Sequence, residues 1–188
     1  IFSDLKKIDF LIVEVGGTVG DIESLPFLEA IRQLRNEMSK NQTIFIHLTL
    51  VPYLKAADEL KTKPTQHSVK ELRGIGIQPD LLICRCERKI TDTDKEKMAL
   101  FCNISAKNII QALDVNNIYE LPLVLNNENL DDRVLYNLNI KKYKKANLKK
   151  WREISNLQKN PKNSVNIGII GKYVELKDAY KSLSEALY

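Results

Sequence analysis

The sequence Ile8-Asp-Phe-Leu-Ile-Val-Glu14-Val15-Gly-Gly-Thr-Val-Gly20-Asp21-Ile22-Glu23-Ser24 contains the parts of an α/β unit in order. The apolar run Ile8–Val15 is typical of a strand. Three glycines within five positions follow it, and they allow a sharp turn and a close approach to a ligand. Two carboxylates then precede a helix-like stretch. In open α/β sheets, ligands bind outside the carboxyl ends of strands, so this segment predicts both a strand and a place for chemistry.

Three more runs have the character of strands. They are short, apolar and rich in β-branched residues, and they cover Thr43–Val51, Leu81–Cys86 and Val165–Ile170. Near-continuous apolar runs of this length are typical of parallel strands that are covered on both faces.

Helical patterns lie between the first strand-like runs. Apolar residues recur every three or four positions over Leu25–Met38, with Pro26 in the first turn, where proline is tolerated. We expect a second helix over Thr65–Leu72, ending at Gly74.

Two more helices are expected further along the chain. The third begins at Thr91 or Asp92, either of which can cap it, and directs three side chains inward: Met98, Ala99 and Phe101. The fourth covers Ala106–Leu113. The alternation of strands and helices predicts an α/β fold with a doubly wound, mostly parallel sheet.

The character of the sequence changes after about Leu125, where polar and turn-forming residues become frequent. Gln158–Ser164 has the composition of a linker, and the run Val165–Ile170 then resembles the first strand of a new α/β domain. We therefore divide the chain into a first domain over residues 1–140, a linker over 141–164, and the start of a second domain over 165–188.

Composition restricts the class of protein. The 188 residues are 44% hydrophobic and 28% charged, which is ordinary for a soluble globular protein. No apolar run approaches the roughly 20 residues needed to cross a bilayer. Three cysteines, an odd number without a paired framework, favour a reducing compartment and a cytoplasmic location, and we expect all three to be buried structural thiols.

Much of the net charge of +5 comes from one cluster. Seven basic residues and no acid lie between Lys141 and Arg152. Clustered lysines can neutralise nucleic-acid phosphates, but the segment matches no nucleic-acid motif. A solvated linker surface is the favoured interpretation, and we expect neither a nucleic-acid nor a membrane partner.

Two segments have the chemistry of a phosphate site. Glu14 at a strand end, followed by glycines, can hold Mg²⁺ through its carboxylate, although an exposed acid at a turn would have the same pattern. Lys61-Thr-Lys-Pro-Thr-Gln66 places two lysines and two hydroxyls before a helix start, where free N–H groups favour anions. A solvated lysine loop is the alternative. No Gly-x-x-x-x-Gly-Lys-Ser/Thr loop occurs in the sequence.

Together these segments resemble the CTP synthase family along essentially the whole chain. The similarity runs through Glu14–Ser24, Pro26–Gln33, His47–Tyr53, Lys61–Leu72, Gly76–Asp80 and Ala99–Asn103. Near the end, Gly171–Tyr180 resembles the start of that family's glutaminase domain. The resemblance implies a synthetase fold related to P-loop proteins and similar to dethiobiotin synthetase.

The resemblance also implies a reaction and its partners. In this family, ATP phosphorylates O4 of UTP, and ammonia from glutamine then displaces phosphate at C4 to give CTP. Mg²⁺ accompanies ATP, CTP inhibits, GTP activates, and the enzyme is a homotetramer. The chain would thus be part of a ligase of pyrimidine biosynthesis with a glutamine amidotransferase domain.

The family's roles can be carried over by position. Glu14 would bind Mg²⁺. CTP would contact Asp21, Ile22 and Glu23. The triphosphate of UTP or CTP would contact Lys61, Thr62, Lys63, Pro64, Thr65 and Gln66, with Lys97 as a further contact. Adenine of ATP would be read by Leu113, Asp114 and Val115.

Other parts of the family's machinery are expected outside this sequence. Its phosphate loop and second Mg²⁺ carboxylate should precede Ile1, and its glutaminase catalytic residues should follow Tyr188. We therefore expect no catalytic residue of the glutaminase in this chain and no activity from the chain alone. The alternative is a truncated, non-catalytic paralogue that binds nucleotides and regulates or assembles with the intact enzyme.

Overall fold

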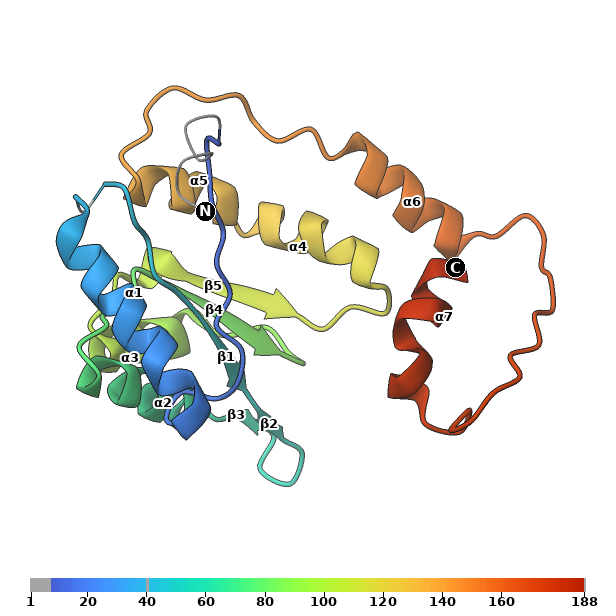
Figure 1. Ribbon diagram of the computed structural model, residues 1–188, viewed down its shortest axis with the longest axis horizontal. Coiled ribbons are helices and arrows are strands. Elements are labelled where there is room, and N and C mark those ends of the chain that lie inside the picture. Colours follow the sequence, from blue (N-terminus) through green and yellow to red (C-terminus); the bar gives the residue numbers. More distant parts are fainter. Residues whose placement is uncertain (1–7, 40, 188) are drawn as a thin grey trace. The chain divides into compact units, whose positions relative to one another are not determined.

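The computed structural model describes residues 8–39 and 41–187 (Figure 1). The chain divides into two compact units. The first takes in the described residues of 1–114 and 124–144, and the second those of 115–123 and 145–188. These units follow from packing, whereas the division into two domains and a linker stays a prediction.

A parallel sheet forms the centre of the first unit. Its strands are β1 (Ile46–Val51), β4 (Leu81–Cys86) and β5 (Ile109–Leu113), in the order β1-β4-β5. Ile46 pairs with Leu81, and Leu82 pairs with Ile109. Two short strands, β2 (Tyr53–Leu54) and β3 (Glu59–Leu60), form an antiparallel hairpin after β1.

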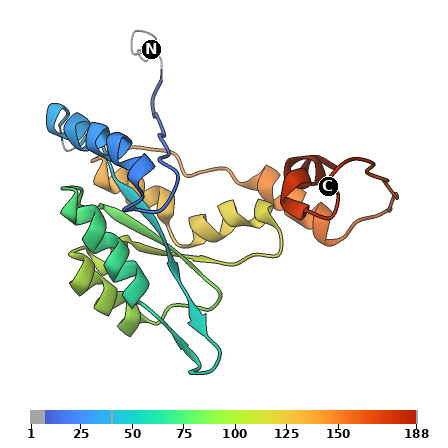
Figure 2. The same ribbon diagram turned by 60° about the horizontal axis from the view of Figure 1, so that its bottom comes forward.

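Helices lie on both sides of this sheet. The first unit contains α1 (Leu25–Glu37), α2 (Lys63–Gly74), α3 (Asp92–Cys102) and α5 (Leu130–Asn137), with the 3-10 helices η2 (Ile22–Ser24) and η3 (Ala106–Asn108). In Figures 1 and 2, α2 and α3 lie side by side on one face of the sheet, and α5 lies on the other side. The predicted α/β fold with a mostly parallel, doubly wound sheet is confirmed.

The main core lies between the sheet and the pair α2 and α3. Residues from both layers are almost fully buried there: Val51, Val69, Leu82, Cys84, Cys86, Ile90, Met98, Cys102 and Ile109. Strand β1 contributes alternate residues, because His47 and Val51 are buried while Leu48 and Leu50 on the opposite face are more than half exposed.

Local sequence explains the helix boundaries. Pro26 lies in the first turn of α1, as expected. The predicted cap of the third helix is Thr91, whose hydroxyl accepts a hydrogen bond from the backbone N–H of Asp94 at 3.1 Å. The same helix ends at Asn103, which adopts a left-handed conformation.

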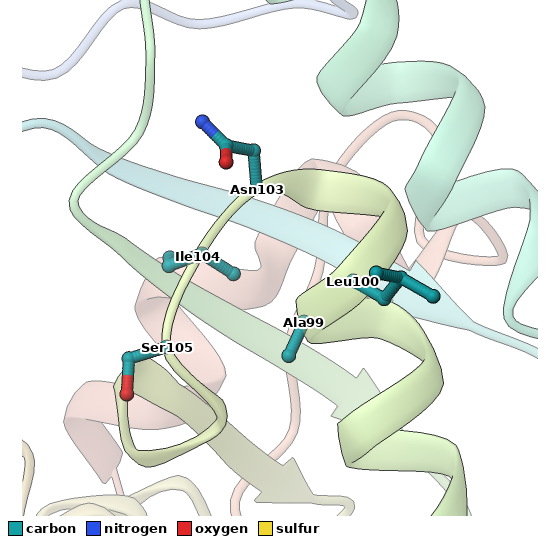
Figure 3. Close-up of a pocket in the computed structure, with 5 residues that line it drawn as sticks. All are labelled: Ala99, Leu100, Asn103, Ile104 and Ser105. Carbon is teal, nitrogen blue, oxygen red and sulfur yellow. The ribbon is translucent and has the colours of Figure 1, made fainter.

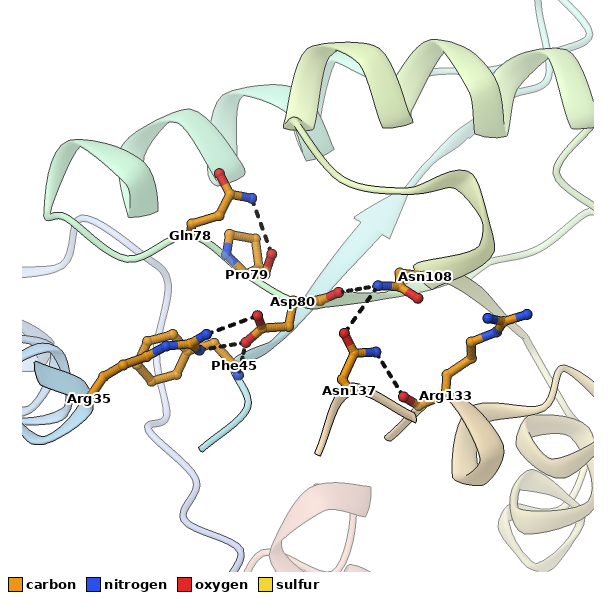
Figure 4. A network of polar contacts seen from close by, with 8 residues as sticks. All are labelled: Arg35, Phe45, Gln78, Pro79, Asp80, Asn108, Arg133 and Asn137. Atoms are coloured by element: carbon orange, nitrogen blue, oxygen red, sulfur yellow. Dashed lines mark hydrogen bonds and ion pairs between the residues drawn. The ribbon is translucent and has the colours of Figure 1, made fainter. Parts of the chain in front are cut away.

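A polar network ties the amino end of the sheet together (Figure 4). Asp80 precedes β4, and its carboxylate accepts hydrogen bonds from Arg35 of α1 at 2.5 and 3.0 Å and from the backbone N–H of Phe45 at 2.7 Å. Its carbonyl accepts from the amide of Asn108, which precedes β5, at 2.9 Å. Asn137 at the end of α5 lies 3.5 Å from that amide. One carboxylate therefore joins α1 to the starts of two strands.

Two predicted strands are wrong. Ile8–Val15 and Val165–Ile170 form no strand, and most of their apolar side chains are exposed, with Ile12 at 92% and Ile170 at 100%. A strand is stabilised by hydrogen bonds to a neighbouring strand, and within the described residues neither run has one.

The predicted fourth helix is also wrong. Ala106–Leu113 contains one 3-10 turn, η3, followed by strand β5. Ile109 and Ile110 are β-branched and buried beside β4, a position that favours a strand. In α3, Met98 and Cys102 are buried in the core and Ala99 packs against it, whereas Phe101 is 57% exposed rather than inward.

The second unit is mainly helical. It contains η4 (Ile118–Glu120), α6 (Lys149–Lys159), η5 (Lys177–Tyr180) and α7 (Lys181–Leu187), while α4 (Leu121–Asn127) spans the boundary between the units. Helix α6 packs on η4, with the rings of Trp151 and Tyr119 6.1 Å apart and Lys159 paired with Glu120. The basic residues of the cluster from Lys141 to Arg152 are exposed, as expected of a solvated surface.

None of the helices in the described parts of the chain combines the length and the apolar character that crossing a membrane requires.

Candidate functional site

Most of the predicted site segments meet at the carboxyl end of the parallel sheet. The hairpin and the residues from Lys61 follow β1, and Asp114 follows β5. The last turns of α1 contact Asp80 and lie near Gly76, both at the amino end. Because α1 and β1 are each about 20 Å long, the segment before α1 lies toward the carboxyl end. This is the side where α/β sheets bind ligands.

The glycine-rich loop before α1 closes on Asp21. The carboxylate of Asp21 accepts a hydrogen bond from the backbone N–H of Thr18 at 2.9 Å, and Ser24 bonds the carbonyl of Asp21 at 2.9 Å. Gly17 and Gly20 have φ of 86° and 105°, which other residues rarely adopt. Ile22 and Glu23 are exposed on η2. The loop is held by its own contacts and presents these two side chains to solvent.

The first turn of α2 has the features of an anion site. Thr62 is its N-cap residue, but the side chain of Thr62 accepts no hydrogen bond from the N–H groups there. Pro64 lies in the first turn and has no N–H, so Lys63 and Thr65 supply the outermost donors. The side chain of Lys63 is exposed, and that of Lys61 is half-buried.

Hydroxyl and amide side chains in the same turn have structural partners. Thr65 is fully buried, and its hydroxyl donates to the carbonyl of Leu50 at 3.3 Å and accepts from Thr49 at 3.1 Å. The amide of Gln66 donates to the hydroxyl of Thr62 at 3.2 Å. Thr65 therefore fixes α2 to β1 and leaves only its backbone N–H for a ligand.

Lys61 already has an acidic partner. Its ammonium pairs with the carboxylate of Glu59 on β3, and its backbone N–H donates to the carbonyl of Pro52 at 2.8 Å. Glu59 is not among the site residues that the sequence predicted. A carboxylate two residues before a lysine on a hairpin is the signal that would have suggested this pairing.

The end of β5 pairs with the strand beside it. The backbone N–H of Asp114 donates to the carbonyl of Cys86 at 2.9 Å, and its carboxylate accepts from Arg85 at 2.8 Å. Leu113 is half-buried at the strand end. Sequence reasoning missed Arg85, although a single charge within the apolar run of β4 could have indicated it.

Glu14, the predicted Mg²⁺ ligand, is exposed. No group of three or more His, Cys, Asp or Glu side chains in the described residues could hold a metal ion. One carboxylate can still serve Mg²⁺, which usually keeps several waters and binds one or two carboxylates together with substrate phosphates. Glu14 therefore fits Mg²⁺ only as part of a nucleotide complex.

Two predicted site residues are less well placed. Lys97 lies in the middle of α3 and is exposed, and its side chain forms no ion pair or hydrogen bond with the described residues. Val115 is the first residue of the second compact unit.

A shallow, open depression of about 450 Å³ lies at the amino end of the sheet instead (Figure 3). It is lined by Ala99, Leu100, Asn103, Ile104 and Ser105, none of which is charged or a predicted site residue. This depression therefore offers no group for phosphate or metal chemistry.

The three cysteines are free and buried, as expected. Burial raises the pKa of the Cys84 thiol to about 12 and that of Cys86 to about 11. Both thiols are therefore protonated near neutral pH, and the protonated form is not the reactive form of a cysteine.

The fold and the carboxyl-end segments define an α/β domain in which helix α2 begins at the carboxyl end of the sheet. The family described as "CTP synthase N-terminus" matches residues 2–140, and the chain belongs to this family.

Similar proteins in three bacteria are each named CTP synthase. The chain is 60% identical to that of Pelagibacter ubique (strain HTCC1062) and 58% identical to that of Parvibaculum lavamentivorans, over 100% of this chain in both cases. It is 54% identical to that of Rhizorhabdus wittichii over 98% of this chain. The matches cover 34–35% of those proteins, so the chain spans about a third of their length.

Proposed function

We propose that this chain is the part of a CTP synthase that binds the triphosphate of UTP, and of CTP as inhibitor. The observation that carries the proposal is the start of α2, where uncapped N–H groups lie beside Lys61 and Lys63 at the carboxyl end of the sheet. N–H donors and ammonium groups together favour a polyanion. Membership of the family described as "CTP synthase N-terminus" supports UTP and CTP as the nucleotides.

The proposed reaction is the ATP-dependent amination of UTP to CTP, with ammonia from glutamine, in a ligase of pyrimidine biosynthesis. Phosphoryl transfer depends mainly on positioning and charge neutralisation, and Mg²⁺ would contribute the latter when bound. Within this chain, Lys61 and Lys63 neutralise phosphate oxygens and Glu14 offers a carboxylate to the metal. Lys97 is proposed as a further contact to the same nucleotide.

The end of β5 is proposed to read adenine of ATP through Leu113, Asp114 and Val115. The ion pair with Arg85 holds the carboxylate of Asp114, which leaves the backbone of this turn as its specific donor and acceptor. Asp21, Ile22 and Glu23 are proposed to contact CTP. The exposure of Ile22 and Glu23 on η2 supports this role.

The whole protein is proposed to be a cytoplasmic homotetramer that GTP activates and CTP inhibits. These properties follow from the family resemblance alone. We propose further that the 188-residue chain makes no CTP by itself, because it spans about a third of its relatives and has no phosphate loop of the Gly-x-x-x-x-Gly-Lys-Ser/Thr type. CTP formed from UTP, ATP and ammonia by the purified chain would refute this part.

The substitution Lys61→Ala in the full-length polypeptide tests the triphosphate site. We expect the dissociation constant of UTP to rise at least about tenfold, since a charge-assisted contact contributes about 1.5–3 kcal/mol. Lys70→Ala is the matched control, because Lys70 is an exposed lysine further along α2. We expect it to change UTP affinity less than about twofold. Equal affinities for the Lys61 variant and the wild type would overturn the assignment.

A further inference from the structure

The hairpin between β1 and α2, residues 52–61, lies between the sheet and the proposed triphosphate segment. It leaves β1 at Val51, turns after β2, and returns through β3 directly into Lys61. Tyr53 pairs with Leu60 across the hairpin, and the carbonyl of Pro52 accepts from the N–H of Lys61. The position of the Lys61 backbone therefore depends on the contacts that hold this hairpin in place.

Arg88 holds the hairpin from the neighbouring strand. It lies in the loop that follows β4, and its guanidinium carbon is 3.9 Å from the centroid of the Tyr53 ring. One of its nitrogens also donates to the carboxylate of Asp58 at 3.1 Å. The guanidinium thus stacks on one strand of the hairpin and bonds the turn between the two strands.

The carboxylate of Asp58 also accepts a hydrogen bond from within the hairpin. The hydroxyl of Tyr53 donates to Asp58 at 2.5 Å, so ring, acid and guanidinium form one cluster. Asp58 has a φ of 49°, a left-handed conformation that only a few residue types adopt readily. The position of the Asp58 carboxylate is therefore set by the turn and by its two partners, Tyr53 and Arg88.

The guanidinium is already engaged within the cluster through one stacked face and one nitrogen. The cluster joins segments that are far apart in the sequence, because Tyr53 and Asp58 belong to the hairpin, whereas Arg88 belongs to the loop that follows β4. The cluster consequently fixes the hairpin to the rigid sheet, immediately before the lysine that is proposed to meet phosphate.

We propose that Arg88 is a positioning residue for Lys61, and that it acts through the hairpin rather than on the nucleotide. This inference rests on the proposed triphosphate site. Positioning of a charged group matters because a flexible ammonium loses rotamer freedom on binding, and a fixed backbone reduces that loss.

The test is a double-mutant cycle with Arg88→Ala and Lys61→Ala in the full-length polypeptide, measured as UTP and UMP dissociation constants. We expect Arg88→Ala to weaken UTP binding about three- to tenfold, since exposed stacking and ion-pair contacts have effects of this size. UMP binding should change less than about twofold. In the Lys61→Ala background, Arg88→Ala should have almost no further effect. Lys89→Ala, an exposed neighbour in the same loop, is the control.

Three outcomes would overturn the inference. They are unchanged UTP affinity in Arg88→Ala, an equal loss for UMP, or the same loss with and without Lys61, which would mean that Arg88 acts directly. Failure of the wild-type polypeptide to bind UTP, or indifference of UTP binding to Lys61, would instead refute the proposed function. Because Arg88 is exposed, its removal should leave the thermal unfolding temperature almost unchanged, so that lost affinity reports positioning and not unfolding.

Discussion

The two ends of the parallel sheet differ in how their polar groups are used. At the amino end, the carboxylate of Asp80 is fully engaged by Arg35 and the backbone of Phe45, and its carbonyl by Asn108 (Figure 4). At the carboxyl end, the start of α2 is uncapped and Lys63 is exposed. The comparison teaches that the charges at the amino end are used by the fold, whereas at the carboxyl end Lys61 and Arg85 have acidic partners and Lys63 is exposed to solvent.

Loss of the Asp80 carboxylate should have the largest effect on stability. We expect Asp80→Ala to lower the free energy of unfolding by about 2–3 kcal/mol, because the variant leaves Arg35 and a backbone N–H without their acceptor. Urea denaturation of the chain measures this change. Glu87→Ala, an exposed acid at the opposite end, should change it by less than about 0.5 kcal/mol. Similar values for both variants would remove the distinction between the two ends.

The buried hydroxyl of Thr65 lies at the carboxyl end, but it should contribute to stability as the polar groups at the amino end do. We expect Thr65→Val to destabilise the chain by about 1–2 kcal/mol, because it leaves the Leu50 carbonyl and the Thr49 hydroxyl without a partner. Thr93→Val on the exposed surface of α3 is the matched control, measured in the same denaturation experiment. A neutral result for Thr65→Val would mean that this hydroxyl is free for the nucleotide.

His47 should make stability depend on pH. It lies on β1 beneath α2, 2.8 Å from the hydroxyl of Ser68, and burial lowers the pKa of its imidazole below the usual value. The unfolded chain then binds the proton more readily, so stability is complete above the unfolded pKa of about 6.5 and decreases as pH falls toward the folded pKa.

His47→Gln should therefore show a smaller loss of stability between pH 7.5 and 5 than the wild type, measured by denaturation at each pH. His67→Gln is the control, because His67 is exposed and is the other histidine of the chain. Identical pH profiles for His47→Gln and the wild type would contradict the assignment.

The smallest effect is expected from the acid that pairs with Lys61. Glu59→Gln should tighten UTP binding by the full-length polypeptide about two- to threefold, since exposed ion pairs contribute little and phosphate must replace this carboxylate. Titration calorimetry against Glu71→Gln, an exposed acid on α2, measures the difference. Weaker binding in the Glu59 variant would mean that the carboxylate assists the nucleotide.

Sequence patterns located two strands of the sheet and the start of α2, but they did not locate every strand. The run Leu81–Cys86 became the central strand β4 with the predicted limits, and Thr43–Val51 contains β1. The start of α2 after Lys61 also follows from sequence, because proline, lysines and threonines mark a helix entry. Arg85 and Arg88 were missed because their partners are about 30 residues away in the sequence, whereas Glu59 was missed although its partner Lys61 is only two residues away.

The sequence by itself determined the α/β class, the helix entries with their caps, and the family, because these depend on local residue patterns. Tertiary structure decided which apolar runs are strands. Ile109–Leu113 is a strand because β4 lies beside it, and Ile8–Val15 is extended without one. Backbone hydrogen bonds in a sheet join residues that are far apart in sequence, so a local pattern cannot specify them. The same reason explains why only the fold shows that Arg88 stacks on Tyr53.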